Sequence, residues 1–435
     1  MRQWMVAAKK ADFYAIAEKF HVDPVVARII RNREVIGEKN IRIYLGGNLS
    51  DLSDPHQMKD MDRLVEILAQ KIRKQVHIRI IGDYDVDGVT SSHLFLTALR
   101  RVGAKVDVVI PHRIQDGYGL SLHLLQQAKE DGVDTILTCD NGIAAIDEIA
   151  WAKAQKMTVL VTDHHAVPFE EHEGRRTEKK SLADAVVNPH QQDCRYPYKE
   201  LCGAGVAWNV IRVLYENYDM DKREAEDLLD FVAMATVCDV MSLTGENRIL
   251  VKEGLKRIRH TKNIGLQALM QACNVQPENI SAYHFGYVLG PCVNATGRLD
   301  TARHALRLFE TGQETEAEEI ARDLVDLNQE RKELTLQGVE MAKKLCEEGG
   351  YEKDPILVLF LPDVHESIAG LIAGRIREMY NRPVFVLTRG EEGVKGSGRS
   401  TENYSMYENM CGCAELFTKF GGHPMAAGSV SYTHL

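Results

Sequence analysis

Three aspartates at alternate positions stand where a short apolar run of the sequence ends. Asp83, Asp85 and Asp87 follow the segment 76–81, whose β-branched residues are typical of a buried strand in a parallel sheet. Ligands of open α/β sheets bind in the crevice beyond the carboxyl ends of the strands. Three carboxylates this close repel one another unless cations neutralise them, so the stretch predicts a metal site.

Two simpler interpretations of this stretch are a solvated acidic turn and a calcium-binding EF-hand loop. Counted from Asp83, position twelve of an EF-hand loop is Leu94, where a bidentate glutamate is needed. The stretch also follows a predicted strand, whereas an EF-hand loop follows a helix. The spacing therefore disfavours the calcium loop and leaves the solvated turn as the alternative to a catalytic metal site.

Two later apolar runs end in the same way. The runs 134–139 and 157–162 are each followed by carboxylate, amide or imidazole side chains, namely Asp140, Asn141, Asp163, His164 and His165. Each of these strand ends, taken alone, is more often a turn than a ligand site. Parallel strands deliver their carboxyl ends to one edge of a sheet, so the convergence of three of them favours one shared site.

The elements that must position these residues are visible as alternating strand and helix patterns. Apolar runs of strand length are separated by amphipathic stretches of ten to fifteen residues, which predicts βαβ units and a parallel sheet. Strands are expected within 76–81, 105–111, 134–142 and 157–165, with a fifth at 183–189. A loop from Gly82 to Gly88 is expected before a helix that begins at Val89 and closes at Gly103. A later apolar helix ends just before Asp239.

The remaining segments predict a second lobe. Residues 315–348 contain one glycine and no proline, so they predict a helix about 50 Å long that connects two lobes. A strand, a helix and a strand follow from residue 355. Glycine-rich stretches at 281–300, 393–400 and 420–429 are expected as loops, in which backbone N–H groups can approach phosphates or simply form tight turns.

Composition excludes several classes of protein. The chain has 435 residues, enough for two or three domains, with 44% hydrophobic and 27% charged residues. It lacks an apolar run that could span a membrane, and its amino terminus lacks the apolar centre of a signal peptide, so a cytoplasmic location is expected. Nine cysteines without a CxxC pair indicate reduced, mostly buried thiols. The net charge of -10 argues against a wholly basic nucleic-acid-coating surface but permits a local basic groove.

An ordered set of motifs resembles a known superfamily. DYDVDG at 83–88, the Asp140-Asn141-Gly142 strand end, TDHH at 162–165 and ATVCDV ending on Asp239 are similar to the four motifs of the DHH phosphoesterases. FGGHPMAAG at 420–428 resembles the signature of the associated DHHA1 domain. With the helical amino-terminal segment and the long connector, residues 20–430 resemble the bacterial single-stranded-DNA-specific exonucleases of this superfamily.

The resemblance implies an α/β fold class and an activity. A helical segment (1–75) would precede a parallel-sheet DHH catalytic domain (76–300), which a connecting helix (301–350) joins to a smaller α/β DHHA1 domain (351–435). The implied activity is metal-dependent 5′-to-3′ hydrolysis of single-stranded DNA to nucleoside 5′-monophosphates, in DNA repair and recombination. The implied partner is single-stranded DNA, with a helicase or a single-strand-binding protein allowed beside it, no membrane, and a monomeric chain.

The same resemblance assigns residues to roles. Two manganese or magnesium ions would be held by Asp85, Asp87, Asp140, His164 and Asp239, with Asp140 between them. Catalytic roles fall on Asp83, Asn141 and His165, the last beside the scissile phosphate. Contacts with DNA fall on Asn294, Arg298, His365, Arg399, Ser400, Gly421, Gly422 and His423.

The chain departs from the family pattern at two places. Cys292 stands where an arginine is expected, and Val364-His365-Glu366 replaces an expected Trp-His-Pro, which puts individual DNA contacts in doubt. The OB domain that usually follows the DHHA1 domain is not seen. The final SYTHL belongs to no expected element, so a truncated end is expected.

Two other functions compete with the exonuclease. A small-substrate phosphoesterase acting on short oligonucleotides, cyclic dinucleotides or pyrophosphate would commonly have a histidine four residues before the first ligating aspartate, and this position is Ile81. A non-catalytic replication scaffold would have no need of every metal-ligand position. A digestion assay with manganese on single strands, duplexes and dinucleotides discriminates the three.

Overall fold

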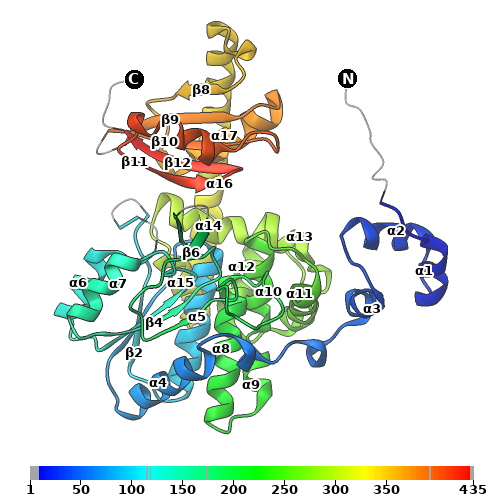
Figure 1. Ribbon diagram of the computed structural model, residues 1–435, viewed down its shortest axis with the longest axis vertical. Coiled ribbons are helices and arrows are strands. Elements are labelled where there is room, and N and C mark those ends of the chain that lie inside the picture. Colours follow the sequence, from blue (N-terminus) through cyan, green and yellow to red (C-terminus); the bar gives the residue numbers. More distant parts are fainter. Residues whose placement is uncertain (1–8, 114–115, 118, 173–174, 391–392, 432–435) are drawn as a thin grey trace. The chain divides into compact units, whose positions relative to one another are not determined.

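The computed structural model describes residues 9–113, 116–117, 119–172, 175–390 and 393–431. Contacts divide the chain into two compact units, drawn as ribbons in Figure 1. The first unit comprises Met1–Gly297 and Thr301–Asp323, and the second comprises Arg298–Asp300 and Leu324–Leu435.

The first unit is built on a parallel five-stranded sheet, as the strand and helix alternation predicts. Its strands are β1 (Ile78–Ile81), β2 (Val106–Val109), β3 (Thr135–Cys139), β4 (Thr158–Thr162) and β7 (Ala185–Val187), in the order β2-β1-β3-β4-β7. Every pairing is parallel, and Ile78 lies opposite both Val106 and Thr135. All four residues of β1 are buried because both faces of the sheet are covered. The fifth strand at 183–189 is confirmed as the short β7.

Helices cover the two faces of this sheet. The helices of the first unit up to the end of the sheet are α1 (Phe13–Phe20), α2 (Pro24–Asn32), α3 (Glu38–Gly46), α4 (Met61–Arg73), α5 (Val86–Arg101), α6 (Leu122–Glu130) and α7 (Ile146–Ala154). Leu125 of α6 and Ile149 of α7 share one apolar core with Ile136 and Val159 of the sheet. On the other face, Ser92 Oγ of α5 lies 3.5 Å from Cys139 Sγ of β3.

The predicted start of the helix after β1 is wrong by three residues. The helix α5 begins at Val86 rather than Val89, with Asp85 as its N-cap and Asp87 in its first turn. Asp85 accepts a hydrogen bond from the Gly88 backbone N–H at 3.0 Å, as N-cap aspartates commonly do. The three aspartates therefore lie on a tight strand-to-helix turn instead of an open loop.

A largely helical region follows the sheet. It consists of α8 (Gly203–Asn217), α9 (Lys222–Glu226), α10 (Leu229–Cys238), α11 (Gly245–Arg257), α12 (Ile264–Ala272), α13 (Ala282–His284), the π-helix η5 (Phe285–Leu289), α14 (Gly290–Leu299) and α15 (Arg303–Glu310). A separate hairpin pairs β5 (Phe169–His172) with β6 (Arg175–Glu178).

The predicted glycine-rich loop at 281–300 is wrong, because this segment is helical from Ala282 to Leu299. Its glycines instead permit close helix packing. A Cβ atom on Gly290 would meet Cys238 Sγ at 2.3 Å, and one on Gly297 would meet the Tyr84 carbonyl oxygen at 2.3 Å. The glycines of this segment therefore indicate close helix packing rather than turns.

The predicted long helix is confirmed as α16 (Glu314–Gly349). The second unit then forms a mixed sheet in the order β11-β12-β10-β9-β8. Its elements are β8 (Leu357–Phe360), α17 (Glu366–Tyr380), β9 (Val384–Gly390), β10 (Gly393–Arg399), α18 (Met406–Cys411), β11 (Lys419–His423) and β12 (Ala426–Ser431). Within the described strands of this sheet, β8 and β9 pair in parallel, and the other pairs are antiparallel.

The glycine-rich stretches of the second unit are strands, so the loops expected there are a wrong prediction. Gly396 lies opposite both Leu387 and Ser429, within a ladder of three antiparallel strands. A Cβ atom on Gly396 would meet Ser429 Oγ at 2.5 Å and Leu387 Cδ2 at 2.8 Å. Glycine is needed here because neighbouring side chains cross the strand. Of the final SYTHL, which was expected to belong to no element, Ser431 is the last residue of β12, and residues 432–435 lie outside the described residues.

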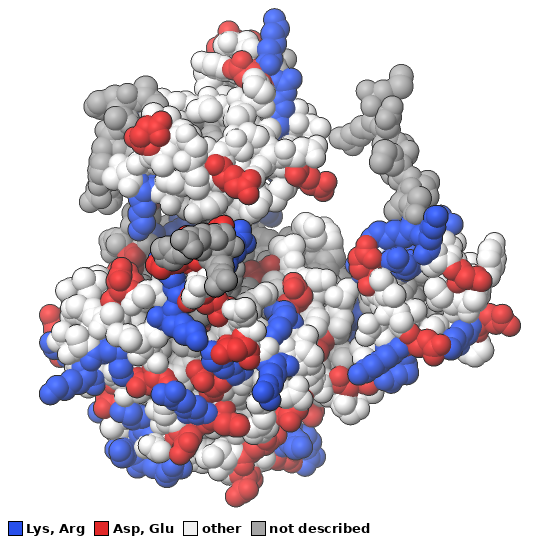
Figure 2. Space-filling view, in the orientation of Figure 1, with Lys and Arg blue, Asp and Glu red and all other residues white. Residues whose placement is uncertain are grey.

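Three further sequence predictions concern the cysteines, membrane-spanning helices and surface charge. The nine cysteines are all free thiols, and five of them are buried. None of the helices in the described part of the chain has both the length and the apolar composition that crossing a membrane requires. Figure 2 shows Lys and Arg side chains interspersed with Asp and Glu over the visible face of the first unit, so this face carries no broad area of one charge.

Candidate metal centre

Seven carboxylate and imidazole side chains gather at the carboxyl edge of the parallel sheet. They form three overlapping groups whose ligand atoms lie within 4.8 Å of one another: Asp83, Asp85 and Asp140; Asp87, His164 and Asp239; and Asp140, His164 and His165. The first three aspartates follow β1, Asp140 follows β3, the two histidines follow β4, and Asp239 is the C-cap of α10. The convergence expected from the three strand ends is therefore present, and α10 adds a fourth contribution.

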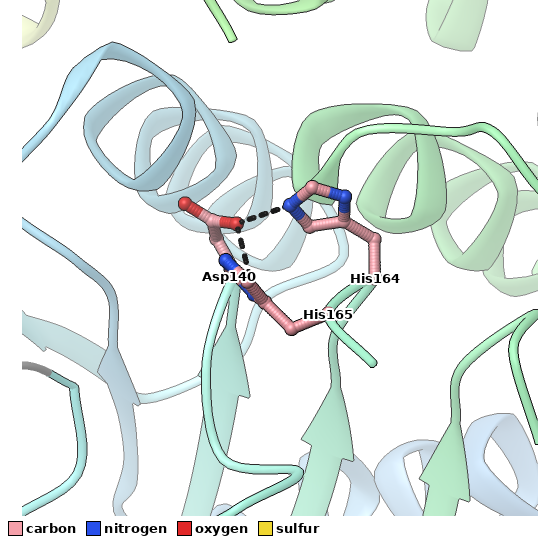
Figure 3. A group of neighbouring side chains, drawn as sticks. All are labelled: Asp140, His164 and His165. Atoms are coloured by element: carbon pink, nitrogen blue, oxygen red, sulfur yellow. Dashed lines mark ion pairs between the residues drawn. The ribbon is translucent and has the colours of Figure 1, made fainter. Parts of the chain in front are cut away.

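His164 is at the centre of this cluster. Its Nε2 atom lies 3.1 Å from Asp140 Oδ1 and 3.6 Å from both Asp87 Oδ2 and Asp239 Oδ2. Figure 3 shows both imidazole rings directed at the Asp140 carboxylate from the segment after β4. Among the described residues, the buried Nε2 atom has no hydrogen-bond partner. An imidazole nitrogen aimed at three carboxylates without a hydrogen bond is the arrangement expected of a metal ligand.

The histidine pair is held by Asp163, whose role the sequence interpretation missed. The Asp163 Oδ1 atom accepts hydrogen bonds from the backbone N–H groups of His164 and His165, and it lies 2.8 Å from His165 Nδ1. Its Oδ2 atom accepts from the Ile143 N–H. The TDHH sequence could have indicated this role, because a buried carboxylate beside an imidazole commonly fixes its orientation.

Asp87 is fixed by a helix that lies far from it in sequence. Its two carboxylate oxygens accept hydrogen bonds from the Gly203 N–H at 2.6 Å and the Ala204 N–H at 2.7 Å, at the start of α8. The partial positive charge of a helix N-terminus stabilises a carboxylate there. A Cβ atom at Gly203 would meet Asp140 Cβ at 2.6 Å, so glycine is required for this approach.

The turn after β3 has an unusual backbone. Asp140 has φ +62°, a left-handed conformation that is uncommon for a residue other than glycine. The neighbouring Asn141 is buried, and its amide nitrogen donates hydrogen bonds to the carbonyl oxygens of Ile81 at 3.0 Å and Cys139 at 2.9 Å. Asn141 thereby ties the ends of β1 and β3 together below the cluster.

Electrostatics at the cluster favour a bound cation. Burial, reinforced by the neighbouring carboxylates, raises the pKa values of Asp83 and Asp140 well above their usual range and raises that of Asp85 as well. Burial and the charges of Asp87 and Asp85 raise the pKa of Asp239 to about 8. Positive charge placed among these groups would relieve the repulsion that opposes their ionisation.

The two histidines differ in protonation. Burial lowers the pKa of His164, which favours the neutral ring that a metal ligand requires. Burial opposes protonation of His165, but the hydrogen bond with Asp163 and the negative charges of Asp163, Asp239 and Asp87 together outweigh it and raise the pKa of His165 to about 9. The His165 side chain is 39% exposed, so its ring lies on the open side of the cluster.

The donor set fits a hard divalent cation. Five carboxylates with neutral imidazole suit manganese or magnesium, whereas a thiolate site would suit a softer metal. Asp83, for which a catalytic role was predicted, belongs to one of the three possible ligand groups, so it is also a candidate ligand. Its buried Oδ1 atom has no hydrogen-bond partner among the described residues.

The residues predicted to contact DNA fall in different places. Asn294 lies on α14, and its Oδ1 atom accepts a hydrogen bond from the Val86 N–H at 3.2 Å, which supports the start of α5. Arg298 groups with the second unit, where it donates to the Ser367 carbonyl oxygen at 2.7 Å. His365 is the N-cap of α17 and lies 2.7 Å from the Ser367 hydroxyl.

The other predicted DNA contacts lie in the sheet of the second unit. Arg399 and His423 are both in register with Ala426, so β10 and β11 bring them to one end of the sheet. Gly421 and Gly422 precede His423 on β11 and are exposed. Ser400 is fully buried and donates its hydroxyl to the Tyr404 carbonyl oxygen at 2.5 Å. Of the two departures, Glu366 forms an ion pair with Lys395 at 2.8 Å, and Cys292 is buried 3.8 Å from Cys273 Sγ.

The chain is similar in sequence to known protein families. Residues 77–236 match the DHH family, N-terminal domain, and residues 353–433 match the DHHA1 domain. The single-stranded-DNA-specific exonuclease RecJ of Haemophilus influenzae is 36% identical over 423 residues, which are 93% of this chain and 71% of the relative. RecJ of Bacillus subtilis is 34% identical over 95% of this chain, and the chain spans 51% of the length of that relative.

Solved structures agree with these sequence matches. RecJ from Thermus thermophilus in complex with Mn²⁺ superposes with a TM-score of 0.80 at 29% identity, covering 96% of this chain and 58% of that one. A second manganese-bound exonuclease RecJ superposes with a TM-score of 0.73 at 32% identity and covers 86% of this chain and 90% of that one.

Proposed function

The chain belongs to the RecJ family, and from this premise we propose that it is a metal-dependent exonuclease that degrades single-stranded DNA from the 5′ end in repair and recombination. The observation that carries the proposal is the cluster of Asp85, Asp87, Asp140, His164 and Asp239, whose ligand atoms converge on one sheet edge. The expected products are nucleoside 5′-monophosphates.

The residues of the cluster would hold two manganese or magnesium ions. Asp140 belongs to two of the possible ligand groups, which supports the role between the ions assigned to it. Asp83 shares a group with Asp85 and Asp140, so it is proposed as an additional ligand. When bound, such a pair of ions turns water into a nucleophile and neutralises charge on the attacking and leaving oxygens.

The chain's own groups orient the substrate. A protonated His165, held by Asp163, presents a cationic N–H donor on the open side of the cluster, where it suits a non-bridging phosphate oxygen. Buried Asp163 keeps this ring fixed before the phosphate arrives. In the second unit, Arg399 and His423 are proposed to hold the strand because they share one end of its sheet.

A digestion assay tests the activity. Strands labelled at the 5′ end would be incubated with the full chain and Mn²⁺, beside matched duplexes, dinucleotides and a cyclic dinucleotide. Early release of a labelled mononucleotide from the single strand, with intact duplex, supports the proposal. Preferred cleavage of dinucleotides or cyclic dinucleotides would indicate the small-substrate phosphoesterase, and intact substrates with bound metal would indicate a scaffold.

His165→Ala tests the assignment of that residue to substrate. We expect the variant to keep its full metal content by elemental analysis and to lose about a hundredfold or more in rate, because a positioned acid or donor contributes roughly that much. Loss of a metal equivalent would instead make His165 a ligand. His123→Ala is a matched control, because His123 is an exposed histidine of α6 whose ring pairs with Asp116.

A further inference from the structure

A cavity of about 810 Å³ in the first unit is not used by the proposed function. It lies among the end of α5, the start of α10 and the segments 256–264 and 309–312. Its volume falls in the range of about 300 to 1,000 Å³ that is usual for small-ligand sites.

The floor of the cavity is aromatic. The ring centroid of His93 lies 4.4 Å from that of Phe231 and 5.9 Å from that of Phe309, and the two phenylalanine rings are 5.0 Å apart. All three side chains are buried, so their positions are set by packing. They provide a firm apolar wall of the kind that a planar ring can contact.

The rest of the wall is unusually basic for this acidic chain. Five lysines and arginines line it against three acids, although the chain as a whole carries a net charge of -10. The lining cations are Arg100, Arg101, Lys256, Arg257 and Lys262. The lining acids are Asp227, Asp230 and Glu310. Arg101, Lys256 and Arg257 pair with acids outside the wall, so the cations left to meet an anion are Arg100 and Lys262.

Several of these cations are held in place from outside the cavity. Arg101 pairs with Glu224 at 3.0 Å, and Arg257 pairs with Glu226, neither of which lines the wall. These pairs fix the guanidinium groups before a ligand arrives, which lowers the entropy lost on binding. Lys262 is exposed at the rim, and Arg100 is tied only weakly, at 3.4 Å from Glu310.

A buried polar group also points to a ligand. His93 is 5% exposed, and within the described part of the chain its Nδ1 atom has no hydrogen-bond partner. Burial, with the charges of Arg100 and Arg101, lowers the pKa of His93 to about 3, so the ring is neutral. His93 lines the cavity, and a buried nitrogen without a partner is uncommon in a folded protein.

We propose that this cavity binds a nucleoside phosphate, with its base against the floor of His93, Phe231 and Phe309 and its phosphate at Arg100 and Lys262. The site is distinct from the metal centre. The helix α5 has Asp85 at one end and Arg100 near the other, a separation of about 22 Å at 1.5 Å per residue. Binding here does not require the proposed nuclease activity.

Equilibrium binding of adenosine 5′-monophosphate to the full chain tests the proposal. The measurement is made in EDTA, where the metal-free cluster of carboxylates repels phosphate and cannot contribute. We expect saturable binding, weakened about tenfold or more when adenosine or inorganic phosphate alone is the probe, because each lacks one half of the recognition. No saturable binding, or equal binding of adenosine, overturns the proposal.

Two variants and a label locate the site. Lys262→Glu and Arg100→Gln should each raise the dissociation constant about tenfold. Lys39→Glu, which makes the same charge change at an exposed lysine of α3, should leave it unchanged. Light-activated 8-azidoadenosine 5′-monophosphate should label peptides from 256–264 or 309–312. Labelling of the peptide that holds Asp83 to Asp87, or equal weakening by Lys39→Glu, overturns the assignment.

Discussion

The helices α5 and α10 have acidic side chains at one end of the pair and basic side chains at the other. They pack together and run in opposite directions, so Asp85 at the start of α5 and Asp239 at the end of α10 share the metal centre. Arg100 at the end of α5 and Phe231 at the start of α10 share the cavity. One end gathers carboxylates, and the other gathers cations over an aromatic floor.

The two ends differ in how far neighbouring groups neutralise their charged side chains. At the metal centre, backbone donors and strand ends hold carboxylates together, and burial, reinforced by their mutual repulsion, raises the pKa values of Asp83 and Asp140. At the cavity, acids outside the wall already neutralise Arg101 and Arg257. The metal centre should therefore respond strongly to a cation and to the removal of a carboxylate, whereas the cavity should respond to smaller changes of hydrogen bonding and pH.

The largest effect is expected at the metal centre. Asp140→Asn should lower kcat by a thousandfold or more, about 4 kcal/mol, because no other carboxylate can replace a group placed between two ions. Metal content should fall in the same variant. Asp147→Asn, an exposed change in the first turn of α7, is the control. A kcat close to that of the parent, with metal content unchanged, would refute the assignment.

The second largest effect is expected from the titration of Asp230 in the wall of the cavity. Burial raises the pKa of Asp230 to about 6, so the folded chain holds a proton that the unfolded chain releases near pH 4. Stability should therefore fall as pH rises from about 4 to 6, by roughly 3 kcal/mol for this group. The Asp230→Asn variant lacks this pH dependence. The unfolding free energy of the variant minus that of the parent should therefore rise between pH 4 and pH 6.

Urea unfolding of parent and variant at pH 4.5 and pH 7 measures the change. Asp227→Asn is the matched control, since Asp227 also lines the cavity but is exposed. A constant difference between parent and Asp230→Asn at both pH values would show that Asp230 is not protonated in the fold near pH 5.

Metal addition should stabilise the first unit by a comparable amount. Mn²⁺ at a hundred times its dissociation constant should raise the unfolding free energy by about 2.7 kcal/mol relative to EDTA. At one fixed Mn²⁺ concentration the gain should be larger at pH 8 than at pH 6, because protons compete with the metal for carboxylates such as Asp239, whose pKa burial raises to about 8. A gain that persists in Asp140→Asn would place the bound ion elsewhere.

The smallest effect concerns one hydrogen bond at the cavity. Thr261 donates its hydroxyl to Asp230 Oδ2 at 2.6 Å, and Thr261→Val removes this bond. We expect a loss of about 1.5 kcal/mol at pH 7, where Asp230 is ionised, and a smaller loss at pH 4.5. Thr335→Val, which removes a hydroxyl that donates to the Arg331 carbonyl oxygen, should show no such pH dependence.

The sequence by itself determined the architecture of the sheet and the edge at which the chemistry lies. Apolar runs such as Ile78–Ile81 repeat at strand length between helical stretches, and parallel strands must deliver Asp85, Asp140 and His164 to the same edge. The long helix α16 also follows from local composition, since it has one glycine and no proline over most of its length. These features depend on neighbours along the chain, which a sequence displays directly.

Tertiary structure alone decided the partners of these groups. The hydrogen bond from the Gly203 N–H to Asp87 joins residues 116 positions apart in the sequence. The hydrogen bond from the Val86 N–H to Asn294 joins residues 208 positions apart. The glycine-rich segments misread as loops became a helix at Gly290 and a strand at Gly396, because the side chains that approach them come from distant elements. No sequence motif marks the cavity, because its floor and rim come from separate segments between His93 and Gly312 that only packing brings together.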